Sequence, residues 1–264
     1  MPMAVIDSGD IHYKLEGKGK PIIMLLPQSK GPVGVGPFIH ALSQSFSVIC
    51  YDQRGTGKSS SPLNEKAMSI EGRAVEVIDL LDNLDLNESY FCCHSTGCGI
   101  GLAVASIMPE LVNALILLNP WRNADSHLST MQNLRIAAAK SLDPYHYAKF
   151  NASLLFPPEY RLAYEVGFEQ MAEAAKSAPQ DIQQIKKRLN SILAFDTRLV
   201  THKITCPTLI IASKDDQLMP AWFGRQLATD ISDTRLVVLD GGGHMLPETR
   251  CPEVISEIIP FIIK

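Results

Sequence analysis

The sequence lacks the features that would place it in a membrane or a secretory pathway. No apolar run approaches the roughly 20 residues of a membrane-spanning helix, and the longest runs, PIIMLLP and ALILLNP, have the length of buried strands. The N-terminal residues show no basic region followed by an apolar stretch, so they do not resemble a signal peptide. We therefore expect a cytoplasmic protein that does not have a membrane as its partner.

Charge of one sign is also scarce. The formal net charge is −4 over 264 residues, and no long run of like charges occurs. Such a distribution gives no basic face for nucleic acid or anionic lipid. The expected partner is a small-molecule substrate and no nucleic acid, and the sequence allows an oligomer without indicating one.

Paired metal-ligand spacing is absent from the six cysteines. Cys92 and Cys93 are adjacent, and no CxxC pair lies elsewhere in the chain. Reduced, mostly buried thiols are the usual state of such cysteines in a cytoplasmic protein. We predict no metal site.

Short apolar runs alternate with longer helical patterns along the chain. Hydrophobic residues make up 46% and charged residues 20% of the sequence, an ordinary globular balance. Strands are expected over 21–26, 47–51, 89–93, 113–118, 207–212 and 235–239, after an N-terminal hairpin over about 3–16. Continuous apolar strands that alternate with helices predict the α/β class, with a mostly parallel sheet covered by helices on both faces.

Helices are predicted between and after these strands, over 69–85, 96–107 and 252–263, with Ser69 as an N-cap. One region contains no convincing strand. It predicts four helices, near 126–141, 143–152, 158–176 and 180–193. We expect a helical cap of residues 121–204, inserted into a core of residues 1–120 and 205–264. The alternative is a helical subdomain with no role in substrate selection.

A serine stands between an apolar strand and a helix, in Cys93-His94-Ser95-Thr96-Gly97. This is the context of a nucleophile elbow, a sharp turn usually written G-x-S-x-G. Gly97 matches that pattern, and the small Cys93 replaces the first glycine. The alternative is a serine that caps an ordinary helix.

A serine hydroxyl needs an adjacent base to act as a nucleophile. Among the seven histidines, His244 follows three glycines after the last expected strand, and these glycines let the loop approach the serine closely. An unperturbed imidazole titrates near pH ~6.5, which suits a general base. His94 is the competing candidate, but the elbow should turn its side chain elsewhere.

The base needs a carboxylate that fixes its tautomer. Asp216 follows the strand expected at 207–212, and its spacing to Pro220 favours it over the neighbouring Asp215. The chain order is then Ser95, Asp216, His244.

Developing oxyanions need preorganised N–H donors. One should be the backbone N–H of Thr96, at the positive end of the helix after the elbow. The second is expected from the loop 27–31, with Ser29 as the donor. The loop lacks the G-K-[ST] sequence of a phosphate loop.

Together these segments resemble the α/β-hydrolase superfamily over essentially the whole chain. Four motifs carry the resemblance in the right order: Asp52-Gln53-Arg54-Gly55-Thr56-Gly57-Lys58-Ser59, the turn at Ser95, the turn at Asp216, and Gly243-His244 followed by Glu248 and Pro252. The resemblance implies the α/β-hydrolase fold. The triad chemistry needs neither a metal nor an organic cofactor, so no cofactor is predicted.

Within the superfamily the sequence is most similar to the aminoacrylate (carbamate) hydrolases of bacterial pyrimidine utilisation. The similarity lies in Tyr51 to Gly57, in Asn119-Pro120-Trp121 with His127, and in Leu155 to Tyr160. Enol-lactonases and small carboxylesterases are looser matches. Proline iminopeptidases share the Asp-Gln-Arg-Gly run, but their His-Gly-Gly-Pro-Gly loop is absent. Two positions depart from the patterns: Pro27-Gln28 replaces the familiar His-Gly pair, and Ser95 stands where the aminoacrylate hydrolase pattern lacks a serine.

The sequence thus predicts a serine hydrolase that cleaves an ester, a lactone or a related small acyl or C–N substrate through an acyl-enzyme. One alternative is an aminoacrylate- or carbamate-type hydrolase of small acids without general esterase activity. The other is a non-catalytic ligand-binding protein on the same fold.

Candidate substrate-binding residues are Gln28, Trp121, Arg122, His127, Phe156 and Tyr160. Arg122 could pair with a substrate carboxylate, although a solvated arginine is the alternative.

Overall fold

One mixed sheet runs through the chain. The computed structural model describes residues 2–6, 9–26, 31–62, 64–177 and 180–263. In these residues eight strands pair in the order β1-β2-β4-β3-β5-β6-β7-β8. They are Met3–Ile6 (β1), Gly9–Glu16 (β2), Pro21–Leu25 (β3), Ser47–Tyr51 (β4), Ser89–His94 (β5), Val112–Leu118 (β6), Thr208–Ser213 (β7) and Thr234–Leu239 (β8). The β1–β2 and β2–β4 pairs are antiparallel and the others are parallel, which confirms the predicted α/β class and the N-terminal hairpin.

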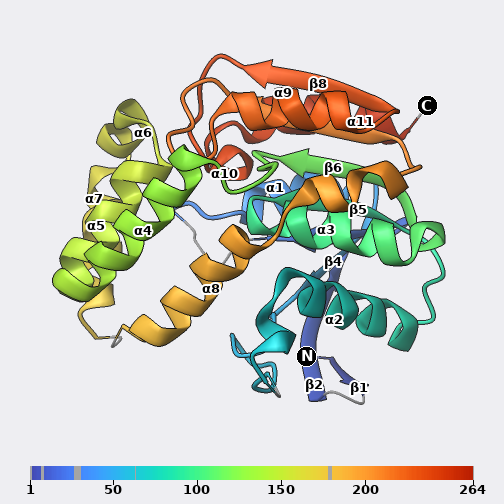
Figure 1. Cartoon of the computed structure of the whole chain (residues 1–264), viewed down its shortest axis with the longest axis horizontal. Helices are drawn as coiled ribbons and strands as arrows, with labels where there is room; N and C mark the ends of the chain where they lie inside the picture. The colour runs from blue at the N-terminus through green and yellow to red at the C-terminus, as the bar shows by residue number, and fades with distance from the viewer. Residues whose placement is uncertain (1, 7–8, 27–30, 63, 178–179, 264) are drawn as a thin grey trace.

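Helices cover both faces of this sheet (Figure 1). In the part of the chain that the structure describes they are Gly36–Ser43 (α1), Ile70–Asn83 (α2), Thr96–Ile107 (α3), Ser126–Ser141 (α4), Pro144–Leu155 (α5), Pro158–Ala163 (α6), Glu165–Ala175 (α7), Ile182–Ala194 (α8), Ala221–Asp230 (α9), Leu246–Thr249 (α10) and Cys251–Ile262 (α11). Short 3₁₀ turns occupy 66–68, 109–111, 197–199 and 201–203.

Successive residues of the central strands serve two separate cores, because side chains alternate between the faces of a strand. Ile23 and Leu25 of β3 pack with α2, α3 and α9. Ile22 and Met24, on the other face, pack with α1, α10 and α11. This burial on both faces explains why the strands read as continuous apolar runs.

The segment between β6 and β7 contains five helices, α4 to α8, and no strand within its described residues. Figure 1 shows α4 to α7 grouped to one side of the sheet, with α8 running back towards the core. Asp125, Asp143 and Asp181 cap α4, α5 and α8 through their side-chain oxygens. The role of residues 121–204 as a substrate-selecting cap stays a prediction.

The structure corrects one predicted helix and adds three. The single helix expected over 158–176 is divided at Tyr164, whose backbone leaves the helical region (φ −116°, ψ 28°). After this change of direction α7 packs closely on Pro32. A Cβ on Gly167 of α7 would lie 2.6 Å from Pro32 Cβ, so the contact depends on the absence of a side chain at Gly167. The sequence analysis did not predict α1, α9 or α10.

Three glycines let α3 lie unusually close to its neighbours. A Cβ on Gly97 would lie 1.9 Å from the carbonyl oxygen of Leu25, and one on Gly99 would lie 2.4 Å from the ring of Trp121. A Cβ on Gly101 would lie 2.5 Å from Cys93 Sγ. Gly101 therefore provides the space that lets cysteine replace the first glycine of the elbow.

We predict that Gly101→Ala destabilises the protein by about 1–3 kcal/mol, because the added methyl overpacks against Cys93. In a Cys93→Ala background the same change should be neutral or stabilising, since alanine favours a helix over glycine by about 1 kcal/mol. Urea denaturation of the four proteins in this cycle measures the coupling. Equal penalties in both backgrounds would contradict the account.

Candidate active site

Ser95 sits at a sharp turn between β5 and α3. Its backbone has φ 55° and ψ −119°, in a region that non-glycine residues rarely adopt. The Ser95 N–H donates to the carbonyl oxygen of Leu118 at 3.0 Å, which fixes the turn to the end of β6. The side chain is consequently held at the carboxyl edge of the sheet, where ligands of parallel α/β folds usually bind.

His244 lies between this serine and a carboxylate. Its Nε2 is 2.8 Å from Ser95 Oγ, and its Nδ1 is 2.7 Å from Asp216 Oδ2. The other carboxylate oxygen of Asp216 accepts the N–H groups of Leu218 and Met219 at 2.8 and 2.9 Å. The three side chains are buried, and each polar contact is within ordinary hydrogen-bond length. The arrangement can transfer a proton from the hydroxyl to the imidazole.

Asp215, the alternative acid, has a different set of contacts. Its Oδ1 accepts the Gly243 N–H at 2.8 Å, and its Oδ2 accepts the Gly242 N–H at 3.3 Å. Both glycines have a positive φ (64° and 125°), which explains their place in this loop. Asp215 thus holds the backbone of the histidine loop, and Asp216 contacts the imidazole.

His94, the competing base, is buried beneath the same loop. Its Nε2 donates to the carbonyl oxygen of His244 at 2.6 Å. Burial, followed by the nearby His244, lowers the pKa of His94 to about 3, so the ring is neutral at ordinary pH. The ring supports His244 from below and does not reach Ser95 within hydrogen-bond distance among the described contacts.

Asn119 is a supporting residue whose role the sequence analysis missed. It follows β6 with a positive φ of 47°. Its Nδ2 donates to the carbonyl oxygens of Gly243 and His244, each at 3.0 Å. Its Oδ1 accepts the Ser213 N–H at 3.0 Å. The buried amide thus joins the ends of β6 and β7 to the histidine loop.

Only one of the two expected oxyanion donors falls within the described residues. Thr96 is the first residue of α3, so its N–H belongs to the unpaired group at a helix N-terminus. It borders the same cavity as Ser95. Gln28 and Ser29 lie outside the described residues, and their roles stay predictions.

Glu248 connects the chain beyond that loop to the helical segment. Its carboxylate, which is 8% exposed, accepts the N–H groups of Gly31 and Val33 at 2.8 and 3.0 Å. Tyr160 of α6 donates its hydroxyl to the same carboxylate at 3.2 Å. Burial and the negative charge of Glu248 raise the pKa of Tyr160, which keeps the hydroxyl protonated as a donor.

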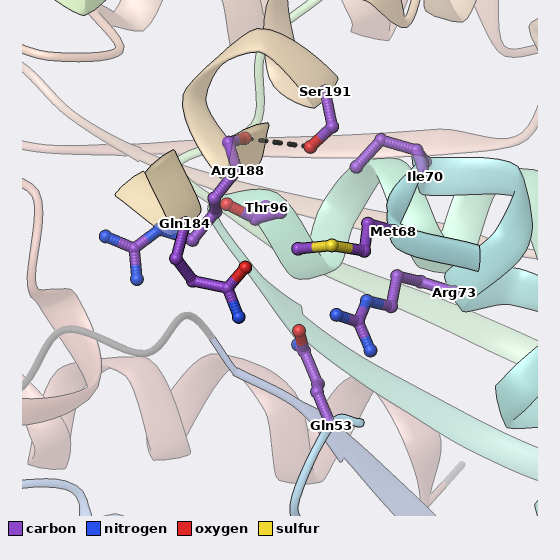
Figure 2. A pocket seen from close by; sticks show the side chains of 8 residues that line it. All are labelled: Gln53, Met68, Ile70, Arg73, Thr96, Gln184, Arg188 and Ser191. Carbon is purple, nitrogen blue, oxygen red and sulfur yellow. Dashed lines mark hydrogen bonds between the residues drawn. The ribbon is translucent and has the colours of Figure 1, made fainter. Parts of the chain in front are cut away.

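The space beside Ser95 is small, with a volume of about 30 Å³, or room for roughly one water molecule. Besides Ser95, Thr96 and His244, it is bordered by Gln132, Arg135 and Arg188 of the helical segment. A second cavity of similar size adjoins it at Thr96 and Arg188. Figure 2 shows this second cavity, with Gln184, Arg188 and Ser191 of α8 facing Gln53, Met68 and Arg73.

The predicted substrate-binding residues that the structure describes lie away from the cavity at Ser95. Arg122 forms a bidentate ion pair with Asp230 at 2.5 and 3.0 Å. His127 Nε2 lies 3.0 Å from the Gln217 carbonyl oxygen on an exposed surface.

The aromatic candidates pack within the protein. Trp121 is fully buried and its indole N–H lies 3.4 Å from the Phe195 carbonyl oxygen. Phe156 stacks on Tyr160, with ring centroids 5.6 Å apart, and borders a larger cavity of the helical segment. Of the five candidates within the described residues, none borders the cavity at Ser95.

Comparison with known proteins identifies the family. The family model of the alpha/beta hydrolase fold matches residues 34–250. The chain belongs to the α/β-hydrolase family. The mostly parallel sheet and its covering helices, described above, are those of the α/β-hydrolase fold.

The chain is also similar to individual members of the family. It is 31% identical over 238 residues to a protein named carbamate hydrolase RutD of Stutzerimonas stutzeri, covering 89% of each chain. It is 30% identical over 260 residues to the RutD of Azorhizobium caulinodans, covering 98% of this chain and 97% of the relative. The crystal structure of the enol-lactonase from Burkholderia xenovorans LB400 superimposes with a TM-score of 0.85 at 25% identity, over 100% of both chains.

A pair of neighbouring carboxylates gives a matched test of the site. We predict that Asp216→Asn lowers the kcat of ester hydrolysis by about 10³- to 10⁴-fold, because the amide no longer favours the correct imidazole tautomer. Asp215→Asn should lower it by less than about tenfold, since within the described part of the chain that carboxylate accepts from the backbone of the loop and from the Ser213 hydroxyl, and His244 pairs with Asp216. Steady-state kinetics with p-nitrophenyl acetate compare the two. Equal losses would contradict the assignment of Asp216.

Proposed function

We propose that the protein is a serine hydrolase that cleaves small esters or lactones through an acyl-enzyme. The observation that carries this proposal is the hydrogen-bonded chain Ser95–His244–Asp216, with contacts of 2.8 and 2.7 Å in a buried site. Along the chain the three residues follow in the order Ser95, Asp216, His244, which is the order that serine enzymes of the α/β-hydrolase fold use.

The reaction follows from these contacts. Ser95 Oγ attacks the carbonyl carbon of the substrate while its proton passes to His244 Nε2. Asp216, held by two backbone N–H groups, stabilises the imidazolium through Nδ1. The tetrahedral intermediate collapses as His244 returns the proton to the leaving oxygen.

Water completes the cycle. His244 takes a proton from the water as the hydroxide adds to the acyl carbon, and the second intermediate releases the acid and regenerates the Ser95 hydroxyl. The N–H of Thr96 at the start of α3 supports the oxyanion in both halves. Removal of one such donor typically lowers turnover by about 10² to 10³.

The similarity to the carbamate hydrolases favours a second candidate. Two relatives with that name are 31% and 30% identical to this chain. In this alternative the same residues act on a C–N bond of a small acid, and general esterase activity is absent. A parallel assay of a carbamate and an ester of the same acyl size distinguishes the two.

We predict that Ser95→Ala lowers the turnover of p-nitrophenyl acetate by at least about 10³-fold without unfolding the protein, because the nucleophile is removed from a folded site. Ser89→Ala is the matched control: Ser89 is buried at the opposite end of β5 and should leave turnover within about twofold. Turnover retained in Ser95→Ala would overturn the acyl-enzyme proposal. Absence of turnover in the wild type, together with hydrolysis of the carbamate, would favour the second candidate.

A further inference from the structure

A buried guanidinium without a carboxylate partner borders the cavity at Ser95. Arg135 of α4 is 5% exposed. It donates to two neutral amides, Asn151 Oδ1 and Gln132 Oε1, each at 3.2 Å. Among the described residues no carboxylate lies within ion-pair distance of Arg135. Burial lowers its pKa to about 10, so the side chain still carries its charge at neutral pH.

Gln132, one turn earlier on α4, leaves a second polar group unsatisfied. It is fully buried, and its Oε1 accepts from Arg135. That contact turns Nε2 away from Arg135, and Nε2 has no hydrogen-bond partner in the described part of the chain. A buried amide donor without an acceptor is costly, so such groups usually have a ligand or a functional reason.

These groups converge on the nucleophile. Gln132 and Arg135 both border the 30 Å³ cavity together with Ser95 and His244. Arg188 of α8 also borders this cavity and, with Thr96, the adjoining cavity of Figure 2. Arg135 and Arg188 also border the neighbouring cavity of about 250 Å³ in the helical segment. The wall opposite Ser95 therefore carries the guanidinium of Arg135, which has no carboxylate partner among the described residues, and the unpaired Nε2 of Gln132.

We propose that Gln132, Arg135 and Arg188 bind a free carboxylate on the acyl part of the substrate, so that the enzyme prefers acyl groups that end in an acid. This inference rests on the proposed function. The carboxylate would accept from the Arg135 guanidinium and from Gln132 Nε2, and would supply the anion that the buried charge lacks. Its binding would hold the reacting carbonyl next to Ser95.

The small size of the space favours a carboxylate over a phosphate. The guanidinium fork matches either anion through two parallel hydrogen bonds, so the fork supports anion binding in general. A planar carboxylate is smaller than a tetrahedral phosphate, which suits the narrow space beside Ser95. Arg122 is not an equivalent candidate, since Asp230 already satisfies its guanidinium.

A matched pair of substrates tests the inference. The p-nitrophenyl monoester of succinic acid and p-nitrophenyl butyrate both have four-carbon acyl groups, and they differ in the terminal carboxylate. We expect Arg135→Met to lower kcat/KM for the succinate monoester by about 10- to 100-fold, the range of a lost charged hydrogen bond. The butyrate should change by less than about threefold. Parallel losses for both esters would overturn the proposal.

Further variants separate charge from packing. Arg135→Lys keeps the charge but not the fork, so it should recover part of the preference for the succinate monoester. If Arg135→Met does not fold, the two esters are compared in Gln132→Leu and in Arg188→Met instead. An unchanged preference for the succinate monoester in both of these variants would overturn the proposal. Arg235→Met, which removes an exposed guanidinium from β8, is the control for net charge. Loss of the preference in Arg122→Met and not in Arg135→Met would also overturn the proposal.

Binding without turnover distinguishes this inference from the proposed function. Calorimetry with Ser95→Ala should detect succinate and should not detect its dimethyl ester, and Arg135→Met in that background should abolish the signal. If the wild type hydrolyses no ester but succinate binding still depends on Arg135, the proposed function fails and the subsite stands. If esters are hydrolysed but succinate does not bind, or inorganic phosphate binds more tightly, the subsite as proposed is wrong.

Discussion

The backbone conformation of Ser95 is the constraint on which the site depends. With φ 55° and ψ −119°, the residue is held in a conformation that costs of order 1–3 kcal/mol and persists only when its surroundings impose it. The surroundings do so from both sides. β5 is paired with β3 and β6, and α3 starts at the very next residue. Because Gly97 lies directly on the Leu25 carbonyl, a residue with a side chain would force α3 away from the sheet.

The positions of the other residues at the candidate site follow from the parallel registers of the sheet. His94 pairs with Leu118, and Ser213 pairs with Leu239, so the strands bearing the elbow, Asn119, Asp216 and the histidine loop all end at one edge. His94, Asn119 and Asp215 then bind the carbonyl and N–H groups of residues 242–244. The imidazole is thus held by its own backbone as well as by Asp216, which limits the motion that would misalign it with Ser95. The buried groups of α4 face this same edge from the helical segment.

Much of the fold and of the candidate site could be predicted from the sequence, because the patterns that indicate them lie within short segments of the chain. The strands are continuous apolar runs. Three of the five helices of the segment 121–204 begin at aspartate caps, and the Ser95 turn has a strand before it and a helix after it. The predicted boundaries of 126–141 and 96–107 agree with α4 and α3. The family that the motifs indicated is the one to which the chain belongs.

What the sequence did not predict depends on contacts between distant segments. Gln132 and Arg135 read as polar residues of an amphipathic helix, and only the packing of α4 and α8 near Ser95 buries them. α9 contains Gly224, whose lack of a side chain permits close packing on Ala212 and Ile210, a reason that no local pattern reveals. The absence of a side chain at Gly101 makes room for the Cys93 thiol. This relation between the two residues likewise appears only once α3 is packed on the sheet.

The central claim is that Ser95 is a nucleophile activated by its buried neighbours. The most direct measurement is covalent labelling with a fluorophosphonate, followed by intact-mass analysis and peptide mapping. The account predicts one phosphonyl group per chain, attached to the peptide that contains Ser95, and slow labelling when His244 is replaced by alanine. A protein that remains unlabelled, or that is labelled at another residue, would contradict it and would favour a ligand-binding role for the same fold.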